Sequence, residues 1–471
     1  PHAETDAGFV FHWSYPHDLR RDVVVPEHQW VEVSAPCRFR LDLVDPCEGR
    51  THRACRSATD PADPNRQVAI FLSPHYKGDG TRCRVFDFRL TTYAADGTKR
   101  TCSRLLVPPP SKVARVALSM TGDEVRRRPD SRTVLSDGRG AAAQVRTGWG
   151  RIASQYDALF AANPNPNVPS DRLVLWTRTR CWLQREGYSR ELDAKCVTRF
   201  EADPAGRFAK WIFHVPCGMG RETAFEFTLK LDDGARLDVR RVDSGELDVG
   251  DQVRLVFRPD VEWRSFHATT KAFSGPEAHF AKSVRARNDG FDFTPYDGTF
   301  SFVVSNGLYH HEPEWTYNVG HAEEAARGQD GSGDLFSPGW ISADLKVGDR
   351  VTLGGMYSRR RGGLAATEKF DAFVPDAAGA PRLRLPLGEA LCESLDLFIV
   401  RRDDLKTVIA GYPWFLDWGR DTFIFMRGMI AAGKVDDAMK ILQAFAAFES
   451  EGTLPNIIYG DKAGNRDTTD A

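Results

Sequence analysis

The chain has 471 residues, of which 41% are hydrophobic and 27% are charged, and its formal net charge is −2. This length predicts roughly two to four domains, and the composition is that of a globular protein able to bury sizeable cores. The near-neutral charge favours neither nucleic acid nor an acidic membrane surface as a partner, and no run approaches the roughly 20 apolar residues that cross a bilayer.

The first 385 residues are dominated by short runs that alternate between apolar and polar side chains. The clearest runs cover residues 31–33, 83–90, 224–231, 252–257, 300–304 and 350–353. Such alternation places one face of a strand on a core and the other in water. Four Asp-Gly pairs suited to hairpin turns punctuate the region, beginning at Asp96, Asp233, Asp289 and Asp297. Together these signals predict an antiparallel β-sandwich architecture.

Proline-rich breakers divide this region. They lie at residues 108–110 and 163–167, and a helical or irregular piece is expected between them at about 150–160. We therefore predict three domains along the chain: a small β module over residues 1–110, a β-sandwich over 111–384, and a helical domain over 385–471.

The hydrophobic period changes from strand to helix near residue 385. Leu387, Leu391, Leu395 and Phe398 line one helical face. An irregular connector is expected over residues 403–420.

Two further helices are predicted after this connector. The first carries Phe423, Met426 and Ile430 and ends at Gly433, a good C-cap. The second opens with Asp436 and Asp437, where acidic side chains suit the helix dipole. Its expected buried face comprises Ala438, Met439, Leu442, Phe445 and Ala446, and Gly452 is expected to end it. Short connections between these helices predict antiparallel hairpins of an all-α domain.

A dense cluster of polar and aromatic residues separates the first two predicted helices. It contains Trp414, Asp417, Trp418, Arg420 and Asp421 within residues 411–422. Arginine and carboxylates exchange hydrogen bonds with sugar hydroxyls, and tryptophan offers an apolar face to a sugar ring. A structural alternative remains open, in which Asp421 only caps the following helix and Arg420 only pairs with Asp417.

A second polar cluster follows the last predicted helix. It includes Asn456 in the run 452–458 and Asp470 in the run 465–471. Polar loops at matching ends of successive helix hairpins would build the mouth of an α/α barrel. A solvated loop with an aspartate cap is the alternative.

Cysteines and histidines give no sign of a metal or disulfide framework. The nine cysteines are scattered and odd in number, without a Cys-x-x-Cys pair, which indicates reduced thiols. Cys47 and Cys55 alone are placed to close a small loop. His310, His311 and His321 do not have the spacing of a zinc site. We expect no metal, no cofactor and a cytoplasmic location.

The residues 411–422 resemble the G-Y-P-W-F-x-x-W-G-R-D-T segment of the glycogen debranching enzyme family. The following Leu454-Pro455-Asn456 and the terminal Thr468-Thr469-Asp470-Ala471 resemble the next two motifs of that family in order and spacing. Asp467 stands where the family usually has Asn. A weaker resemblance to the family's N-terminal β domain runs over 314–318, 323–328 and 334–339, and residues 1 to about 290 carry no matching motif.

The resemblance implies a β-sandwich followed by the start of an (α/α)₆ barrel that hydrolyses α-1,6-linked glucose at glycogen branches. Related barrels invert configuration, using an acid and a base roughly 6.5–9.5 Å apart. It assigns Asp421 and Asp470 to the catalytic site. The residues that it assigns to substrate binding are Trp414, Asp417, Trp418, Arg420 and Asn456. Because both ends of the chain look cut, the acid and base proper are expected beyond residue 471.

The expected partner is a branched α-glucan, with no nucleic acid and no membrane. Two other functions remain open. The chain could belong to another glycosidase on the same barrel, of glucoamylase or trehalase type, which would cleave linear glucan or trehalose. It could also be a non-catalytic carbohydrate-binding β module, whose sugar affinity would survive deletion of residues 385–471.

Overall fold

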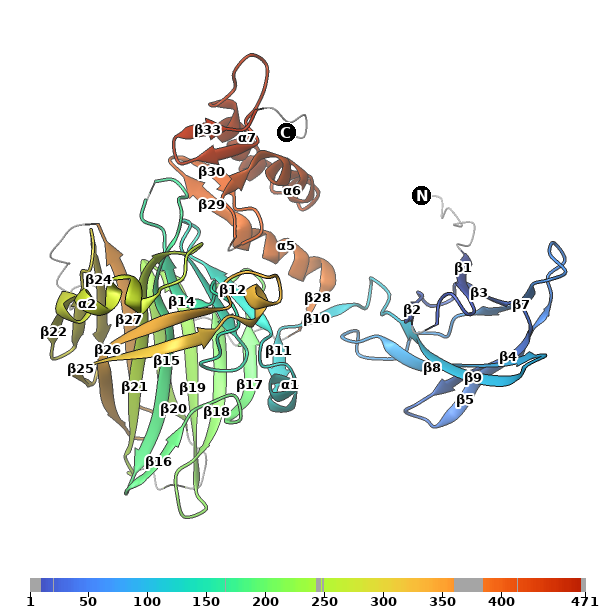
Figure 1. Ribbon diagram of the computed structural model, residues 1–471, viewed down its shortest axis with the longest axis horizontal. Helices are drawn as coiled ribbons and strands as arrows, with labels where there is room; N and C mark the ends of the chain where they lie inside the picture. Colours follow the sequence, from blue (N-terminus) through green and yellow to red (C-terminus); the bar gives the residue numbers. More distant parts are fainter. Residues whose placement is uncertain are drawn as a thin grey trace. The chain divides into compact units, whose positions relative to one another are not determined.

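The structure is a computed structural model that describes residues 10–19, 21–165, 167–242, 247, 250–359, 384–412 and 414–466. Strands far outnumber helices along the described chain, in agreement with the predicted β-rich class (Figure 1). The chain divides into two compact units, which are Pro1–Ala117 with Arg384–Glu389, and Leu118–Leu383 with Ala390–Ala471. No described helix is both long and apolar enough to cross a lipid bilayer.

The first unit contains two sheets around one apolar core. The four-stranded sheet has the order β1 (Val10–Ser14), β3 (Trp30–Ala35), β7 (Gln67–Leu72) and β6 (Ala58–Thr59). The five-stranded sheet has the order β2 (Val23–Val24), β9 (Gly97–Val107), β8 (Arg84–Ala94), β4 (Arg38–Asp45) and β5 (Arg50–Arg56). Alternate residues of β8, including Phe86 and Phe88, enter the core beside Trp13 and Phe71. A short pair, β10 (Arg115–Ala117) with β28 (Arg384–Pro386), also belongs to this unit.

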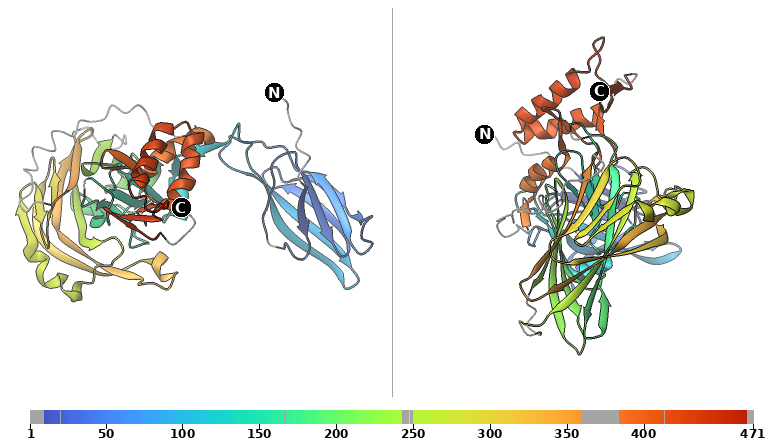
Figure 2. Two further views of the ribbon diagram at one scale, coloured as in Figure 1. Left: turned by 90° about the horizontal axis from the view of Figure 1, so that it is seen from above. Right: turned by 90° about the vertical axis from the view of Figure 1, so that its left-hand side faces the viewer.

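The second unit contains a sandwich of two large sheets (Figure 2). The nine-stranded sheet has the order β11 (Ser119–Thr121), β17 (Val197–Ala202), β18 (Ala209–Pro216), β19 (Glu222–Asp232), β20 (Gly234–Val242), β27 (Arg350–Ser358), β24 (Thr299–Val304), β23 (Gly290–Phe293) and β22 (Val284–Arg287). The other has the order β12 (Arg132–Ser136), β13 (Ala142–Arg146), β14 (Ala158–Ala162), β15 (Leu173–Arg185), β21 (Val253–Ser265), β26 (Ser332–Leu345) and β25 (Leu308–Gly320), with β16 (Tyr188–Glu191) paired to β15.

One large core joins these two sheets. Trp176 and Phe257 come from the second sheet, while Trp211 and Phe227 come from the first, and all four are buried. Short helices fill the connections: α1 (Gly122–Arg127), α2 (Pro276–His279), α3 (Ala322–Ala325) and the 3₁₀ turns Ala272–Ser274 and Ala281–Ser283. Alternation along the strands therefore puts aromatic side chains between the sheets, as the sequence pattern predicts.

The strand predictions are confirmed except at one place. Each of the six alternating runs falls in a strand apart from the first residue of two of them, Cys83 and Gln252, which directly precede β8 and β21. Each Asp-Gly pair lies in or beside the connection between two antiparallel neighbours. The exception is the end of the segment 150–160: residues 150–157 are irregular, as one of the two expectations had it, but residues 158–160 begin β14. All five residues of β14 are buried, so the strand has no polar face and its alternation is absent from the sequence.

The C-terminal region combines three helices with short strands. Helix α5 (Leu387–Phe398) leads into the hairpin β29 (Ile399–Arg402) and β30 (Leu405–Val408). Helices α6 (Gly419–Ala431) and α7 (Val435–Ala446) follow, with β31 (Asp417–Trp418), β32 (Ile457–Tyr459) and β33 (Lys462–Gly464) forming a small sheet. Gly433 has φ +79° directly after Ala432, the C-cap residue of α6, so a left-handed glycine ends this helix as predicted. That these helices begin an (α/α)₆ barrel stays a prediction.

Two details of the predicted helical region are wrong. The connector over 403–420 is not irregular, because it contains β30 and β31, and α6 already begins at Gly419. The buried face of α7 is rotated from the expected one. Ala438 and Phe445 are buried as predicted, but Met439, Leu442 and Ala446 are exposed, and Ile441 and Ala444 are buried instead. In α6, Ile430, which the prediction placed on the apolar face, is also exposed.

The cysteines are all free thiols, three of them buried, so the loop considered for Cys47 and Cys55 is not closed by a disulfide.

Candidate functional site

The small C-terminal sheet brings the two predicted polar clusters together. Strand β31 pairs with β32 so that Asp417 lies opposite Ile458 and Trp418 opposite Ile457. The Gly419 N–H donates to the Asn456 carbonyl at 2.8 Å. Segments separated in the sequence by α6 and α7 thus meet where α6 begins. We call this place, made by Phe415, Trp418, Arg420, Asp421 and Asn456, the α6 entrance.

The solvent-facing part of the α6 entrance combines charge with aromatic surface. The side chains of Arg420 and Asp421 are 44% and 47% exposed, and their charged groups approach to 3.6 Å. The Trp418 ring is half-buried and meets the exposed Phe415 ring edge-on, with centroids 5.7 Å apart. A guanidinium and a carboxylate beside an indole can together hold a polyol with an apolar face.

Asn456 forms the cap of α6 from another segment of the chain. Its buried side-chain oxygen accepts the Arg420 N–H at 3.3 Å, and its carbonyl accepts the Gly419 N–H. The residue at the N-cap position, Trp418, has no side-chain acceptor of its own. These bonds satisfy two of the four N–H groups that every helix start leaves unpaired. The alternative in which Asp421 caps α6 is therefore wrong, since Asp421 lies inside the first turn.

Asp417 forms a buried ion pair with Arg402. Its Oδ2 lies 2.6 Å from Arg402 Nη2 and 2.8 Å from Arg402 Nε. The remaining Arg402 Nη1 donates to the Gly460 carbonyl at 2.8 Å, which ties β29 to the β32–β33 turn. Burial raises the pKa of Asp417, and the arginine opposes that rise. The expected alternative, a pair between Asp417 and Arg420, is not formed, because Arg420 lies beside Asp421.

The first half of the segment 411–422 packs on the sandwich instead of facing solvent. The Tyr412 hydroxyl is buried and donates to the Ala141 carbonyl at 3.4 Å. Burial raises the pKa of Tyr412 to about 12. The half-buried Trp414 ring lies between the Arg132 guanidinium, 5.1 Å from its centroid, and the edge of Tyr156.

Arg172 anchors the same segment from the sandwich. Its Nη2 donates to the Phe415 carbonyl at 3.1 Å, and its guanidinium lies over the Tyr412 ring at 5.1 Å and the Phe266 ring at 4.5 Å. Sequence reasoning missed both Arg172 and Arg402. No motif surrounds either arginine, so only the folded chain reveals them.

The predicted site residues thus fall into three groups. Trp418, Arg420, Asp421 and Asn456 lie together at the α6 entrance. Asp417 is buried directly behind it, and Trp414 packs on the sandwich. Asp470 lies outside the described residues.

The motifs over residues 314–339 lie in and between β25 and β26 of the sandwich. Strand β25 pairs with β26 so that Trp315 lies opposite Phe336. The Asp334 carboxylate accepts the N–H groups of Ala272 and Asn318, both at 2.8 Å. Acidic residues of this region therefore hold loops in place by accepting backbone N–H groups.

Two solved structures share a weak likeness with the chain. One is a polysaccharide lyase, with 10% identity and a TM-score of 0.18 over 49% of this chain and 33% of that one. The other is an uncharacterised Listeria monocytogenes protein in complex with glucose, magnesium and calcium. It has 7% identity and a TM-score of 0.14 over 72% of this chain and 30% of that one. The chain thus spans about a third of each. No curated protein matches the chain significantly.

Two family models match most of the chain in the predicted order. The one described as glycogen debranching enzyme N terminal matches residues 133–352, and the one described as amylo-alpha-1,6-glucosidase matches residues 393–471. The first match begins at residue 133, far upstream of the motifs over residues 314–339. The strands of the sandwich that precede those motifs therefore belong to this domain as well. The second covers the whole described α6 entrance. The chain belongs to the glycogen debranching enzyme family.

Proposed function

We propose that this protein is a glycoside hydrolase that releases glucose from α-1,6 branch points of a glycogen-like glucan. The observation that carries the proposal is the pair of exposed residues Arg420 and Asp421 beside the half-buried Trp418 and the buried Asn456, within the region matched by the amylo-alpha-1,6-glucosidase model. It supports a sugar site because its charged and aromatic groups suit the hydroxyls and the C–H face of one glucose ring.

Each residue of the α6 entrance has a proposed role. The Trp418 ring packs against the sugar, while Arg420 and Asp421 hydrogen-bond neighbouring hydroxyls and so orient the ring for cleavage. Asn456 keeps the first turn of α6 in place, and the Arg402–Asp417 pair holds the strand before it. Asp421 and Asp470 are the proposed carboxylates of the catalytic site, with Trp414 and Asp417 lying behind the contact surface.

Glucose release from glycogen limit dextrin by the intact protein tests this proposal. We expect Asp421→Asn to lower kcat/KM by at least about a hundredfold, because a substrate misplaced by about 1 Å can lose about that much in rate. Asp436→Asn is the matched control, an exposed aspartate in the first turn of the next helix, and should leave the rate unchanged. Cleavage of only linear maltooligosaccharides or trehalose, or equal losses in both variants, would overturn the assignment.

The stereochemistry is proposed to be inverting. Water activated by a base on the face opposite the leaving oxygen converts an α-linkage into β-glucose. Proton NMR during the first minutes of hydrolysis should therefore show the β anomer ahead of mutarotation. Initial release of α-glucose would instead require a covalent glycosyl-enzyme and a retaining mechanism.

A further inference from the structure

Two loops of the first unit bring three metal-binding side chains together. One loop precedes β3 and carries Glu27 and His28, and the other follows β7 and carries His75. The antiparallel pairing of these strands extends past its last rung, because Ser73 N–H donates to the Gln29 carbonyl at 2.9 Å. The Ser73 hydroxyl also accepts the Gln29 N–H, at 3.0 Å. The two loops therefore leave the sheet side by side.

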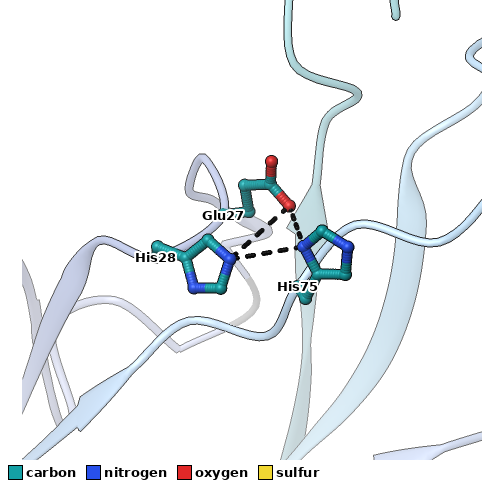
Figure 3. Close-up of side chains that lie close together, drawn as sticks. All are labelled: Glu27, His28 and His75. Carbon is teal, nitrogen blue, oxygen red and sulfur yellow. Dashed lines mark hydrogen bonds and ion pairs between the residues drawn. The ribbon is translucent and has the colours of Figure 1, made fainter.

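The donor atoms of the three side chains face one common point (Figure 3). His28 Nε2 lies 3.3 Å from His75 Nδ1. Glu27 Oε2 lies 2.5 Å from His75 Nδ1 and 3.9 Å from His28 Nε2. Zinc–nitrogen bonds of about 2.0–2.1 Å at tetrahedral angles separate two ligand atoms by roughly 3.3–3.5 Å. The histidine pair already has this separation, and the two glutamate distances lie on either side of it.

In this cluster the Glu27 carboxylate is held in place, whereas the two histidine rings have room to turn. The Glu27 carboxylate is pinned by the Tyr76 N–H at 2.8 Å, so its loop is tied to the loop of His75. The His28 and His75 side chains are 58% and 60% exposed, which leaves room for the rings to turn and for a further ligand. His28 has φ +59°, a conformation uncommon outside glycine, and it places the ring on the side of His75.

We propose that Glu27, His28 and His75 bind a divalent cation of the zinc class. Two imidazoles and one carboxylate are a ligand set that suits Zn²⁺, with a fourth position for water or an external ligand. The site lies wholly within the first unit and is separate from the α6 entrance. The bound cation would link the loop before β3 to the loop after β7. It would stabilise this unit, because a ligand that binds only the folded state raises the free energy of unfolding.

Calorimetric titration of the full chain with Zn²⁺ tests the proposal, after alkylation of the exposed thiols that could also bind the metal. We expect one equivalent to bind and to raise the melting temperature. His28→Ala and His75→Ala should each weaken binding by at least about tenfold, since each removes a direct ligand. His12→Ala is the matched control, because His12 is an exposed histidine 3.2 Å from a carboxylate but belongs to no such three-ligand cluster among the residues that the structure describes.

Co²⁺ provides a readout that needs no variant. The alkylated chain should show the visible absorption of Co²⁺ bound by nitrogen and oxygen ligands, and Zn²⁺ should displace it. No bound equivalent, or an affinity that is the same in the parent, His28→Ala and His75→Ala proteins, would overturn the proposal.

Discussion

Arg402 and Asp417 illustrate how a buried charge pair positions the candidate site. Both side chains are almost fully buried. Removing one partner leaves an uncompensated charge, so we expect Arg402→Met to destabilise the second unit by about 3–5 kcal/mol. Urea unfolding followed by tryptophan fluorescence measures this change.

Two further variants make that test specific. Arg420→Met changes an arginine of the same region whose side chain is 44% exposed, and should alter stability by under about 0.5 kcal/mol. Arg402→Met combined with Asp417→Leu removes both charges and should recover much of the loss. A small cost for Arg402→Met alone would show that the pair does not hold β31.

Asp137 gives the sandwich a predictable pH dependence. Its carboxylate accepts the N–H groups of Arg139 and Ala141, at 2.8 and 3.0 Å, and burial raises its pKa to about 6. The unfolded chain has the ordinary value of about 4. Between these values the folded state holds a proton that the unfolded state has lost, so this group's contribution is present at low pH and falls as pH rises through the window.

The comparison of parent and Asp137→Asn proteins measures this effect. We expect the stability of the parent, relative to the variant, to fall between about pH 4 and about pH 6 and to change little above that. The free energy of unfolding at each pH is the quantity to compare. Parallel curves through this window would mean that the carboxyl titrates at its ordinary pKa.

At the scale of elements, the first turn of α6 depends on a hydrogen-bond acceptor, Asn456, that follows α7 in the sequence. Asn456→Ala removes the side-chain oxygen that accepts the Arg420 N–H. We expect a loss of about 1 kcal/mol and faster hydrogen exchange at the Arg420 amide. Asn456→Asp keeps an acceptor at the positive end of the helix dipole and should preserve protection. Equal exchange in all three proteins would show that the cap is not formed.

The prediction for α7 succeeded at its beginning but failed at its end and in its buried face. The acidic first turn is a local signal, and α7 begins beside it at Val435. The expected end at Gly452 is wrong, because α7 already ends at Ala446. Its apolar side chains, however, extend around more than one face, from Met439 and Leu442 to Ile441. The core with α6 and the β29–β30 hairpin buries Ile441, and that choice depends on partners that the helix sequence does not contain.

At the scale of the whole molecule, the two units have separate cores. Phe88 lies in the core of the first unit and Phe227 in that of the second. We expect Phe88→Ala and Phe227→Ala each to cost about 3–5 kcal/mol, because both leave a large cavity. Differential scanning calorimetry should show each variant lowering the melting temperature of a different transition. A single transition shifted equally by both would mean that the units unfold together.

The sequence by itself determined the β-rich class, most strand positions, the presence and order of the C-terminal helices, and the family, because alternation, turn chemistry and contiguous motifs are local properties of the chain. It also brought Trp418, Arg420, Asp421 and Asn456 to notice. Only the tertiary structure decided which polar groups of these motifs face solvent and which are buried. Asp417 pairs with Arg402, Asn456 caps α6, and Arg172 holds Phe415. Each of these contacts joins residues distant in the sequence, and a buried polar group takes whichever partner the fold brings within hydrogen-bonding distance.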